Sequence, residues 1–408
     1  MKNIAIIGGG AAGFFTAINI KENIPDAKVT IFEKTDKLLA KVRISGGGRC
    51  NVTNVISEPI ALAKNYPRGE KQLTKVFKQF TTSDTVKWFE TRGVELKVED
   101  DGRIFPVSNS SESIINCFLK LTTLHQIEIL TNTPVQKIKS IDNYFELTLQ
   151  NKTKVFDYVV ICTGGHPKIE GFDWLSNLEL QFVTPLPSLF SFNIKPHPMI
   201  DFMGLSFKEI TVKVAKSKLQ QTGPLIITHW GFSGPAILKL SAWGARELAE
   251  KNYQFDLIIN WTGKETETTT TQLLENYRLE NPKKLIFSHR LFDLPTRIWE
   301  YFCQNSEIET DRKWQDISKK QLNKLVQFLH NDIYAVKGKT TYKEEFVTAG
   351  GLQLSEIDIN TMESVKQAGL YFAGEVVNID GITGGFNFQN AWSNGFLVAK
   401  SIAEKLNH

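Results

Sequence analysis

The chain has few cysteines and no long hydrophobic run. Its 408 residues include four cysteines, and no Cys-x-x-Cys pair occurs, which excludes a disulfide framework and a dithiol relay. No apolar run approaches the roughly 20 residues needed to cross a bilayer, and the apolar run at residues 4–7 is too short for a signal-peptide core. The seven histidines lack metal-ligand spacing, so no metal site is predicted. We therefore expect a cytoplasmic protein that does not span a membrane.

Excess charge of one sign is also scarce. The formal net charge is +4, with 23% charged residues. Lys213, Lys216 and Lys218 fit one solvated face of a strand, and Lys283-Lys284 and Lys319-Lys320 are isolated pairs. No basic stripe is evident, so nucleic acid is not an expected partner. The length allows roughly two or three domains, and we expect a small-molecule substrate; the oligomeric state is left open.

The first residues form a nucleotide-binding pattern. An apolar run at 4–7 breaks into Gly8-Gly9-Gly10-Ala11-Ala12-Gly13, and a helical stretch at 14–21 follows. Gly8 allows a tight turn, Gly10 lets the backbone approach a pyrophosphate, and Gly13 lets the helix lie close to the strands. The phosphates would then face the N-terminus of that helix. The alternative is a structural turn without a ligand, but strand, turn, helix, strand and acid occur in the expected order.

An acidic residue ends the second apolar run. Glu33 follows the run at 29–32 and stands about 20 residues beyond Gly13, where a carboxylate accepts hydrogen bonds from a ribose. A carboxylate, rather than a basic residue, favours a ribose without a 2′-phosphate. FAD or NAD is therefore favoured over NADP.

The second hundred residues change to a period of two. Runs at 127–130, 135–141, 144–149 and 154–156 predict a strand followed by a meander, with turns at Asp142-Asn143 and Asn151-Lys152. The continuous apolar run at 158–162 is typical of a strand buried on both faces, and it ends in Thr163-Gly164-Gly165. A meander before such a strand matches FAD-binding domains of the glutathione-reductase type. A plain NAD-binding domain would have a helix there, so FAD is the favoured cofactor.

The far end of the chain carries a second glycine–acid pattern. An apolar run at 370–373 leads into Gly374-Glu375, and Asp380, Gly384-Gly385 and a predicted helix at about 389–406 follow. In FAD-binding domains of the glutathione-reductase type, a carboxylate at this position hydrogen-bonds the ribityl chain. The last helix points its N-terminus at the flavin ring, where its dipole stabilises the negative charge of the reduced form. Glu375 is the predicted ribityl ligand and Asp380 its competitor; an ordinary loop is the alternative.

The remaining segments predict further helices and an insert. Ser83 is a plausible cap for the helix at 83–92. From about residue 182 the pattern changes to short strands, a helix and a mainly helical stretch, which we expect to pack over the cofactor. The predicted elements are helices at 71–80, 83–92, 111–121 and 235–251, strands at 95–98, 104–106, 189–194, 205–214, 225–228 and 255–261, and mainly helical structure at 266–330.

Five segments together resemble the HI0933-like bacterial flavoproteins, the YhiN and BaiN group, which includes enzymes described as aminoacetone oxidases. They are residues 8–13, 41–54, 102–106, 228–235 and 374–390. Ser-Gly-Gly-Gly-Arg-Cys-Asn and Gly-Gly-Phe-Asn-Phe-Gln-Asn are the most specific parts, and the resemblance covers essentially the whole chain. It implies no settled substrate. Phe386 and Phe388 stand where a tyrosine and an aliphatic residue are common, so a phenol hydrogen bond is not available at 386.

The resemblance implies an α/β fold. A discontinuous FAD-binding Rossmann domain of the glutathione-reductase type, with a parallel sheet and a β-meander, would contain an inserted domain of a β-barrel plus helices. The predicted divisions are 1–185 for the first part of the FAD domain, 186–345 for the inserted substrate or cap domain, and 346–408 for the C-terminal part.

The glycine-rich loop at 45–54 is the segment we expect against the isoalloxazine ring. Its glycines would let backbone N–H groups reach flavin N5 and O4. Arg49 would bring positive charge to a reduced flavin or an acidic substrate, and Asn51 and Asn54 can donate and accept hydrogen bonds. The alternative is that these side chains hold a long loop together. Lys41 and Arg43 are expected near the pyrophosphate or the flavin.

Cys50 and His229 are the remaining candidates for chemistry. Arg49 beside Cys50 would favour a thiolate, but no resolving cysteine is near, and a packed small side chain is the favoured interpretation. His229 lies in a segment that joins a strand to a helix, with Ser233 as the predicted cap. The histidine could act as acid or base, while a packed ring beside Trp230 is the alternative.

The predicted function is that of an FAD-dependent oxidoreductase. It would exchange hydride between flavin N5 and a small substrate, by amine oxidation or by reduction of an unsaturated carbonyl compound. No second nucleotide fingerprint occurs, so NAD(P)H would share the substrate entrance as a transient donor; otherwise oxygen reoxidises the flavin. A flavin-bound module that modifies RNA or tRNA, or binds a partner with redox state as a switch, is the alternative. The catalytic candidates are Arg49, Asn51 and His229.

The predicted cofactor-binding residues come from the glycine turn, the glycine-rich loop, the strand ends and the C-terminal segment. They are Gly8, Gly10, Ala11, Ala12, Gly13, Glu33, Lys34, Lys41, Ser45, Gly46, Gly47, Gly48, Arg49, Cys50, Asn51, Val135, Thr163, Gly164, Gly165, Gly374, Glu375, Asp380, Gly385, Phe386, Asn387, Asn390 and Ala391.

Overall fold

A computed structural model describes residues 1–142, 144–150, 152–341 and 347–407. The chain forms two compact units, residues 1–188 with 342–408 and residues 189–341. We call them the nucleotide unit and the insert, and each is described by itself. The first division falls at 188/189, three residues after the predicted one, whereas the predicted division at 345/346 lies outside the described residues.

The nucleotide unit is built on a seven-stranded sheet in which the two ends of the chain meet. The strand order is β19 (Ile357–Asp358), β20 (Glu363–Ser364), β21 (Leu370–Phe372), β10 (Tyr158–Ile161), β1 (Asn3–Ile7), β2 (Lys28–Phe32) and β6 (Glu128–Leu130). Strands β21, β10, β1, β2 and β6 run parallel, which confirms the predicted Rossmann-type sheet. The short antiparallel strands β19 and β20 carry no period-two pattern and were not predicted.

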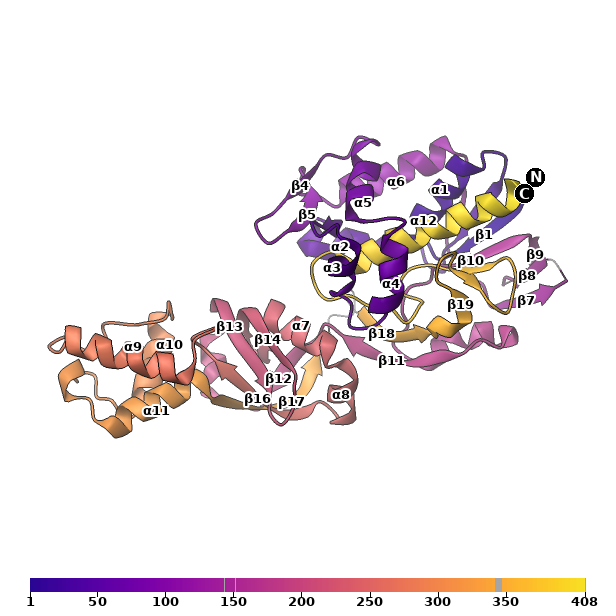
Figure 1. The fold of residues 1–408 in the computed structure, drawn as a ribbon. Helices are drawn as coiled ribbons and strands as arrows, with labels where there is room; N and C mark the ends of the chain where they lie inside the picture. Colours follow the sequence, from indigo (N-terminus) through magenta and orange to yellow (C-terminus); the bar gives the residue numbers. More distant parts are fainter. Residues whose placement is uncertain (143, 151, 342–346, 408) are drawn as a thin grey trace. The chain divides into compact units, whose positions relative to one another are not determined.

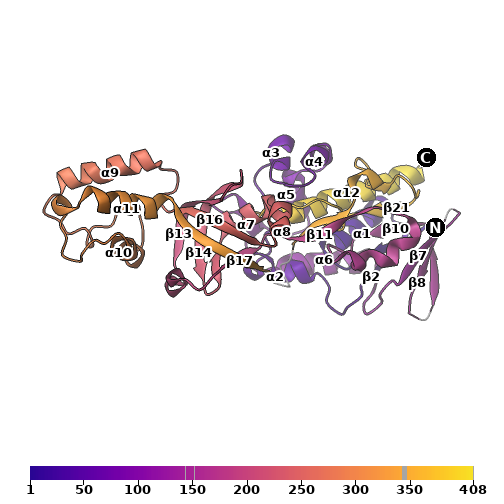
Figure 2. The ribbon, with the colours of Figure 1, turned by 90° about the horizontal axis from the view of Figure 1, so that it is seen from below.

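The first and last helices of the chain pack together beside this sheet. Helix α1 spans Ala11–Asn23 and α12 spans Phe386–Asn407, and both views show α12 running along α1 (Figures 1 and 2). A Cβ on Gly395 of α12 would lie 2.7 Å from the Thr16 hydroxyl of α1. The helices therefore cross at a glycine, because a larger residue would separate them. Helix α12 begins at Phe386, three residues before the predicted start.

Smaller elements surround the sheet and agree with most of the predicted segments. The meander of β7 (Lys137–Ile141), β8 (Tyr144–Thr148) and β9 (Thr153–Phe156) is confirmed, although Asn143 and Asn151 of its predicted turns lie outside the described residues. The cap of α5 is Thr81, not Ser83, because Thr81 and Asp84 form a capping box. The other elements are α3 (Pro59–Ala63), α4 (Glu70–Phe77), α5 (Thr82–Glu90), α6 (Glu112–Leu124), β3 (Thr53–Asn54), β4 (Leu96–Val98), β5 (Arg103–Pro106), β11 (Phe182–Ser188) and β18 (Val347–Leu352), with 3₁₀ turns at Ile169–Leu178 and Leu354–Glu356.

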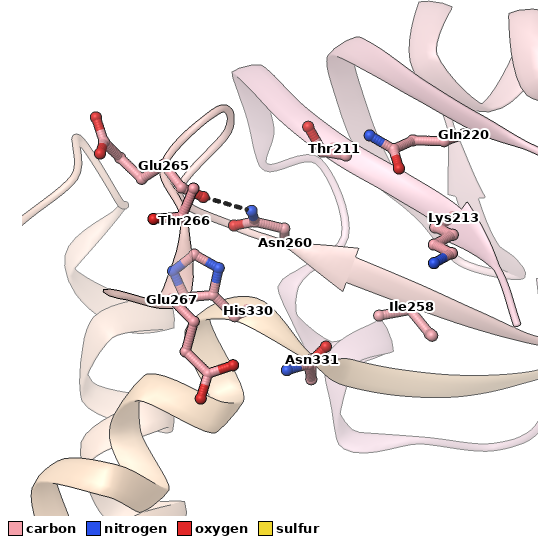
Figure 3. Close-up of a pocket in the computed structure, with 10 residues that line it drawn as sticks. All are labelled: Thr211, Lys213, Gln220, Ile258, Asn260, Glu265, Thr266, Glu267, His330 and Asn331. Carbon is pink, nitrogen blue, oxygen red and sulfur yellow. Dashed lines mark hydrogen bonds between the residues drawn. The ribbon is translucent and has the colours of Figure 1, made fainter. Parts of the chain in front are cut away.

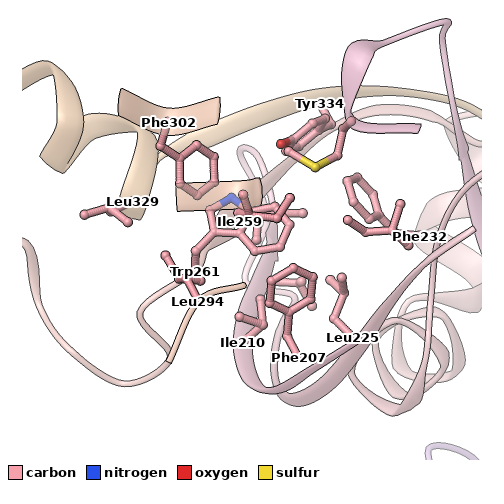
Figure 4. Close-up of a cluster of buried hydrophobic side chains, with 14 of the residues drawn as sticks. Phe207, Ile210, Leu225, Phe232, Ile259, Trp261, Leu294, Phe302, Leu329 and Tyr334 are labelled. Carbon is pink, nitrogen blue, oxygen red and sulfur yellow. The ribbon is translucent and has the colours of Figure 1, made fainter. Parts of the chain in front are cut away.

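The insert contains a closed six-stranded barrel with a packed core. Going round the barrel, the strands are β12 (Ser191–Ile194), β15 (Gly231–Ser233), β14 (Gln220–Thr228), β13 (Ser206–Val214), β16 (Gln254–Asn260) and β17 (Asp332–Thr340). Phe207, Phe232, Trp261 and Tyr334 lie inside it (Figure 4). Helices α7 (Pro235–Trp243), α8 (Ala245–Glu250), α9 (Glu267–Glu280), α10 (Thr296–Asn305) and α11 (Lys319–His330) complete the unit, with 3₁₀ turns at Pro198–Phe202 and Trp314–Asp316. The barrel-plus-helices insert implied by the family resemblance is confirmed.

Three local predictions in the insert were wrong. The helix expected at 235–251 is divided at Gly244. Its cap is Gly234 rather than Ser233, because the Ser233 hydroxyl accepts from Ser191 at 2.7 Å. The strand expected from Leu189 begins at Ser191, since Leu189 has a φ of +55°. No helix in the described ranges is long and apolar enough to span a membrane.

Candidate functional site

The glycine turn between β1 and α1 has the geometry expected of a phosphate-binding turn. Gly8 has a φ of +118°, and a Cβ there would lie 2.3 Å from the Cys162 carbonyl oxygen. A Cβ on Gly13 would lie 2.0 Å from the Gly8 carbonyl oxygen, so α1 packs directly against the turn. At Gly10 no atom lies within 4 Å of the Cβ position. The backbone of Gly10 is therefore open to a ligand at the N-terminus of α1.

Glu33 braces this turn from the end of β2. One carboxylate oxygen accepts from the Gly9 N–H at 2.9 Å, and the other accepts from the N–H and hydroxyl of Thr35, both at 2.9 Å. Because a carboxylate offers about four acceptor directions, Glu33 can accept a ribose hydroxyl as well. Val135 is half-buried beyond β6, where the Thr133 N–H donates to the Glu33 carbonyl. Lys34 is exposed.

The glycine-rich segment follows a short helical turn. Helix α2 spans Ala40–Gly48 as assigned, but Ser45, Gly46 and Gly47 have non-helical geometry, so the loop predicted from Ser45 is confirmed there. Lys41 and Arg43 lie on the helical turn before it, and their place near the pyrophosphate or the flavin stays a prediction. Gly47 and Gly48 have φ of +69° and +83° with no atom within 4 Å of their Cβ positions. Their backbone faces open space, as a segment that covers a planar ligand requires.

Arg49 is held by protein groups on several sides. Its guanidinium lies 4.0 Å from the centre of the Phe105 ring, donates to Glu99 at 2.5 Å and donates to the Gly46 carbonyl at 3.3 Å. The positive charge is thus paired with Glu99 and stacked on an aromatic ring. This favours the interpretation that Arg49 holds the segment in shape.

Asn51 and Asn54 fasten the glycine-rich segment to the C-terminal one. With its amide oriented to satisfy both neighbours, Asn51 donates to the Thr53 carbonyl at 3.0 Å and accepts from the Gly385 N–H at 2.9 Å. Asn54 donates to the Gly384 carbonyl at 3.1 Å. A Cβ on Gly385 would lie 2.5 Å from the Thr53 carbonyl oxygen. Segments more than 300 residues apart in the sequence are therefore locked side by side.

Cys50 is a packed thiol. Its side chain is fully buried and its φ is +62°. Burial raises the pKa of the thiol to about 12, so the protonated form predominates at neutral pH. Burial therefore favours a packed side chain over a nucleophilic thiolate. Cys117, Cys162 and Cys303 are likewise buried and free.

The two acidic candidates near the C-terminal end have different surroundings. Glu375 accepts from Lys41 at 2.6 Å and from the Thr348 N–H at 2.9 Å, with its side chain 16% exposed. Asp380 is fully buried and receives a two-point contact from Arg68 and a hydrogen bond from the Ser188 hydroxyl at 2.8 Å. Burial raises the pKa of Asp380, and Arg68 opposes that rise. Asp380 is therefore a buried ion-pair partner, whereas Glu375 is partly exposed; the contact of Glu375 with the ribityl chain stays a prediction.

Buried polar atoms without a partner mark where a ligand would fit. Native proteins pair nearly all buried polar atoms, yet seven atoms around β10, β18, α1 and α12 have no partner among the described residues. Together with the open glycines 10, 47, 48 and 164, they form a polar cradle that fits FAD. These atoms are Thr16 Oγ1, Thr163 Oγ1, His166 Nε2, Thr348 Oγ1, Asn378 Oδ1, Asn390 Oδ1 and Asn394 Nδ2.

Several of these groups were not predicted from the sequence. Thr348 sits on a strand without a motif, next to Gly165, whose Cβ would lie 2.4 Å from the Thr348 hydroxyl. Burial lowers the pKa of His166, and Lys34 and Lys41 lower it further while Glu375 raises it. Gly374 was predicted, and a Cβ there would lie 2.9 Å from the Cβ of Ala12. The end of β21 therefore touches the start of α1.

The start of α12 is fixed by hydrogen bonds to its own approach loop. The Asn387 side chain accepts from the Gly381 N–H at 2.8 Å and donates to the Gly381 carbonyl at 2.9 Å. The Tyr66 hydroxyl donates to the Phe386 carbonyl at 2.6 Å, and the two rings pack edge to face. Asn390 and Ala391, also predicted, are buried in the first turns of the helix. The positive end of the helix dipole is thus held in one place.

The insert provides one candidate side chain and one small hollow. His229 is exposed in the turn between β14 and β15, with its ring centre 4.2 Å from that of Trp230; its catalytic role stays a prediction. A polar hollow of about 260 Å³ lies where β13 and β16 meet α9 (Figure 3). Its buried His330 is already bonded to Thr270 at 2.6 Å. Burial lowers the pKa of His330.

The whole chain matches known proteins of one family. A profile described as the HI0933-like protein Rossmann domain matches residues 2–401. The chain is 28% identical to a ribosomal RNA dihydrouridine synthase of Haemophilus influenzae, covering 98% of both chains. It is 28% identical to the Escherichia coli protein of the same name, covering 97% of both. It is 25% identical to a 3-dehydro-bile acid delta(4,6)-reductase of Clostridium scindens, covering 99% of this chain and all of that one.

Solved structures share the fold at low sequence identity. The open conformation of a flavocytochrome c3 fumarate reductase superposes with a TM-score of 0.50 at 14% identity, covering 99% of this chain and 78% of that one. A 3-ketosteroid delta1-dehydrogenase from Sterolibacterium denitrificans superposes with a TM-score of 0.50 at 11% identity, covering 99% and 100%. At such identity these likenesses concern the architecture alone.

Proposed function

The chain belongs to the HI0933-like family, and from this premise we propose that it is an FAD-dependent reductase of carbon–carbon double bonds conjugated with a carbonyl group, with the uracil ring of RNA as its substrate. The polar cradle is the observation that supports FAD as the cofactor. The glycine turn, the glycine-rich segment and the C-terminal segment contribute to one place, and seven buried polar atoms there lack partners.

The names of the relatives support this reaction type. A dihydrouridine synthase saturates the C5=C6 bond of uracil, which is conjugated with the C4 carbonyl. A delta(4,6)-reductase of a 3-keto steroid saturates double bonds conjugated with the 3-keto group. The two substrates differ in size and charge but share an electron-poor carbon that accepts hydride. Hydride delivery to that carbon is therefore the chemistry that fits both.

Each part of the chain has a defined task in this proposal. The N-terminus of α1 and the open Gly10 hold the pyrophosphate, and Glu33 and Glu375 accept hydrogen bonds from the ribose and the ribityl chain. The positive end of α12 stabilises negative charge near N1 and the C2 carbonyl. When bound, FAD supplies hydride transfer at N5. Arg49, Asn51 and Asn54 are positioning residues, because their side chains contact Glu99, Gly385 and Gly384.

The electron donor in this proposal is NADH or NADPH. The chain has one glycine fingerprint of the Rossmann type, at residues 8–13. A nicotinamide would therefore enter by the same route as the substrate and leave before the substrate binds. Saturation of the double bond also requires a proton at the carbon next to the carbonyl, which water can supply.

An anaerobic titration tests the reaction type. We expect NADH or NADPH to bleach the flavin absorbance of the purified protein within seconds. Adding a uridine-rich RNA should then restore the yellow colour and produce dihydrouridine, which mass spectrometry detects as a gain of two hydrogens. Recovery with 2-cyclohexen-1-one but not with RNA would move the substrate to small ring enones. Bleaching by an amine alone, with peroxide on exposure to air, would contradict the proposal and favour amine oxidation.

A further inference from the structure

The charge of the chain is divided unequally between its two units. The insert, residues 189–341, carries 21 Lys and Arg against 16 Asp and Glu, whereas the rest carries 27 against 28. Within the insert, the barrel portion at 189–263 and 332–341 carries 10 against 6, and the helical portion at 264–331 carries 11 against 10. The small overall charge of +4 therefore conceals a basic barrel.

Six lysines of the barrel lie on neighbouring strands or in the turns that adjoin them. We call them the lysine stripe: Lys195, Lys213, Lys216, Lys218, Lys337 and Lys339. The register places Lys213 opposite Ile258 on β16 and Lys337 opposite Gln254 on the same strand. Lys216 and Lys218 lie in the β13–β14 hairpin, where the Ala215 N–H donates to the Asp256 carbonyl. Lys195 follows β12, and its N–H donates to the Ala335 carbonyl of β17. The stripe thus crosses the barrel from the hairpin to β12.

The stripe is positive without compensation from nearby carboxylates. Among the described residues, none of its lysines has an Asp or Glu oxygen within ion-pair distance. Five of them are exposed, and Lys339 lies over the Tyr253 ring at 4.7 Å. Lys195 also lowers the pKa of Lys337, since the two ammonium groups face each other. Asp256 is the exposed acid between these strands, and no ion pair joins it to another described residue.

Carboxylates mark one end of the lysine stripe. Lys213 stands on the rim of the polar hollow, and Glu265 and Glu267 lie on the other side of it (Figure 3). Two carboxylates repel a phosphate chain, so the anion-binding surface ends at Lys213. The surface therefore runs from Lys213 through the hairpin to Lys195 and Lys337.

We propose that the lysine stripe binds the phosphate backbone of the RNA substrate. Lysines act on phosphates as point charges and supply affinity without reading bases, which suits an enzyme whose selectivity resides at the ring it reduces. Facing ammonium groups repel each other, and a phosphate between Lys195 and Lys337 would relieve that repulsion. This proposal rests on the proposed function, because the reduction of a uracil ring supplies the reason for RNA.

RNA binding by matched charge variants tests the stripe. The stripe variant is Lys195→Gln/Lys337→Gln/Lys339→Gln, and the control variant is Lys283→Gln/Lys284→Gln/Lys319→Gln, which removes the same charge from the helical portion. The probe is a fluorescein-labelled 20-nucleotide oligouridine followed by anisotropy. We expect the stripe variant to bind about 10-fold or more weakly and the slope of log affinity against log salt to fall by about 2. The control variant should stay within about 2-fold of the wild type.

Three outcomes would overturn the stripe assignment. They are equal losses in the two variants, no binding of the oligouridine by the wild type, and stripe-dependent binding of anionic-lipid vesicles or polyglutamate without binding of RNA. FAD content and the flavin spectrum, measured on every variant, separate unfolding from lost contacts. A wild type that reduces cyclohexenone but does not bind RNA would retain the reductase chemistry and lose the stripe. A wild type that binds RNA through the stripe but reduces no enone would retain the stripe and contradict the reductase chemistry.

Discussion

The two units of this chain satisfy their buried polar groups to different degrees. In the nucleotide unit, seven buried side-chain atoms around the glycine turn, β18 and α12 have no hydrogen-bond partner among the described residues. In the insert, the buried His330, Asp332 and Ser241 are each hydrogen-bonded and the barrel core is continuous, while Arg312 Nε and Trp314 Nε1 lack a partner among the described residues. The nucleotide unit thus gathers its unpaired polar atoms in one cradle that fits a cofactor, whereas the insert has a continuous apolar core of its own.

This difference implies different sources of stability. A ligand that binds only the folded state adds RT ln(1 + [L]/Kd) to the free energy of unfolding. The nucleotide unit should therefore gain stability from FAD, while the insert should depend on its core and its buried polar network. Hydrogen exchange read by mass spectrometry follows the peptides of each unit separately and can test this division.

The largest effect is expected where the nucleotide unit holds a buried charge pair. Asp380→Ala leaves Arg68, with a side chain 10% exposed, without the carboxylate that receives its two-point contact. Breaking one side of a buried ion pair costs about 3–5 kcal/mol. We expect the free energy of unfolding in urea to fall by that amount, with faster exchange confined to the nucleotide unit.

The matched control is an ion pair at the surface. Arg43 and Glu112 have side chains 51% and 48% exposed, so Glu112→Ala should change the free energy of unfolding by about 1 kcal/mol or less. Equal losses in the two variants would show that Asp380 is less buried in solution than the structure indicates. Faster exchange in the insert would contradict the separation of the two units.

Gly10→Val tests the dependence of the nucleotide unit on its cofactor. Gly10 has a φ of −98°, which valine can adopt, and no atom lies within 4 Å of its Cβ position. The apoprotein should therefore fold normally, while the branched side chain occupies the space of the pyrophosphate. We expect FAD affinity to fall at least about 100-fold, or roughly 3 kcal/mol, by flavin fluorescence.

A second glycine with open surroundings serves as the control for this change. Gly93 also has no atom within 4 Å of its Cβ position, and its φ of +82° is tolerated by asparagine. Gly93→Asn should retain its flavin. Normal flavin content in Gly10→Val would overturn the assignment of the glycine turn as the pyrophosphate site.

The pH dependence of the insert follows from one buried acid. Burial raises the pKa of Asp332 from 3.8 to about 6, although the Trp261 N–H at 2.9 Å and the Tyr334 hydroxyl both donate to its carboxylate. Between about pH 4 and pH 6 the folded insert binds a proton that the unfolded chain has released. Its stability should therefore fall by roughly 3 kcal/mol as the pH rises through this window and then level off.

Urea unfolding at several pH values, followed by hydrogen exchange of the peptides of the insert, measures this slope. Asp332→Asn keeps an acceptor for both donors and removes this titration. The fall in the free energy of unfolding over the same pH range should therefore disappear. A wild-type insert that becomes more stable between pH 4 and pH 6 would show that the buried carboxylate stays ionised. The insert would then need a compensating cation that the described residues do not provide.

Sequence patterns predicted the elements that local chemistry determines. The parallel strands, the glycine turn and the meander follow from apolar runs and glycine spacing, which act over a few residues. The position of Asp380 could not be predicted, because its partner Arg68 is 312 residues away. The glycine-acid pattern favoured Glu375 over its competitor Asp380, and tertiary packing shows how far their surroundings differ.

Helix boundaries and the polar cradle were also beyond what the sequence could predict. Three glycines at 46–48 predict a loop because glycine disfavours helix, and the backbone is non-helical at Ser45, Gly46 and Gly47; the helical turn just before them was not predicted. Thr16, Thr348 and Asn394 belong to ordinary strand and helix patterns. Their role emerges only where α1, β18 and α12 converge, so no window of the sequence could reveal it. The lysine stripe is likewise created by barrel register.

The smallest effect is expected at Glu33. It tests how strongly the nucleotide unit depends on the adenosine end of its cofactor. Glu33→Ala removes the acceptor for Gly9 and Thr35 and the proposed acceptor for the ribose. We expect FAD affinity to fall about 10-fold, or roughly 1.4 kcal/mol, by calorimetric titration of the apoprotein. Glu33→Gln keeps one oxygen acceptor and should lose less. If both variants bind FAD as the wild type does, Glu33 only braces the turn, and the adenosine end is held by the backbone alone.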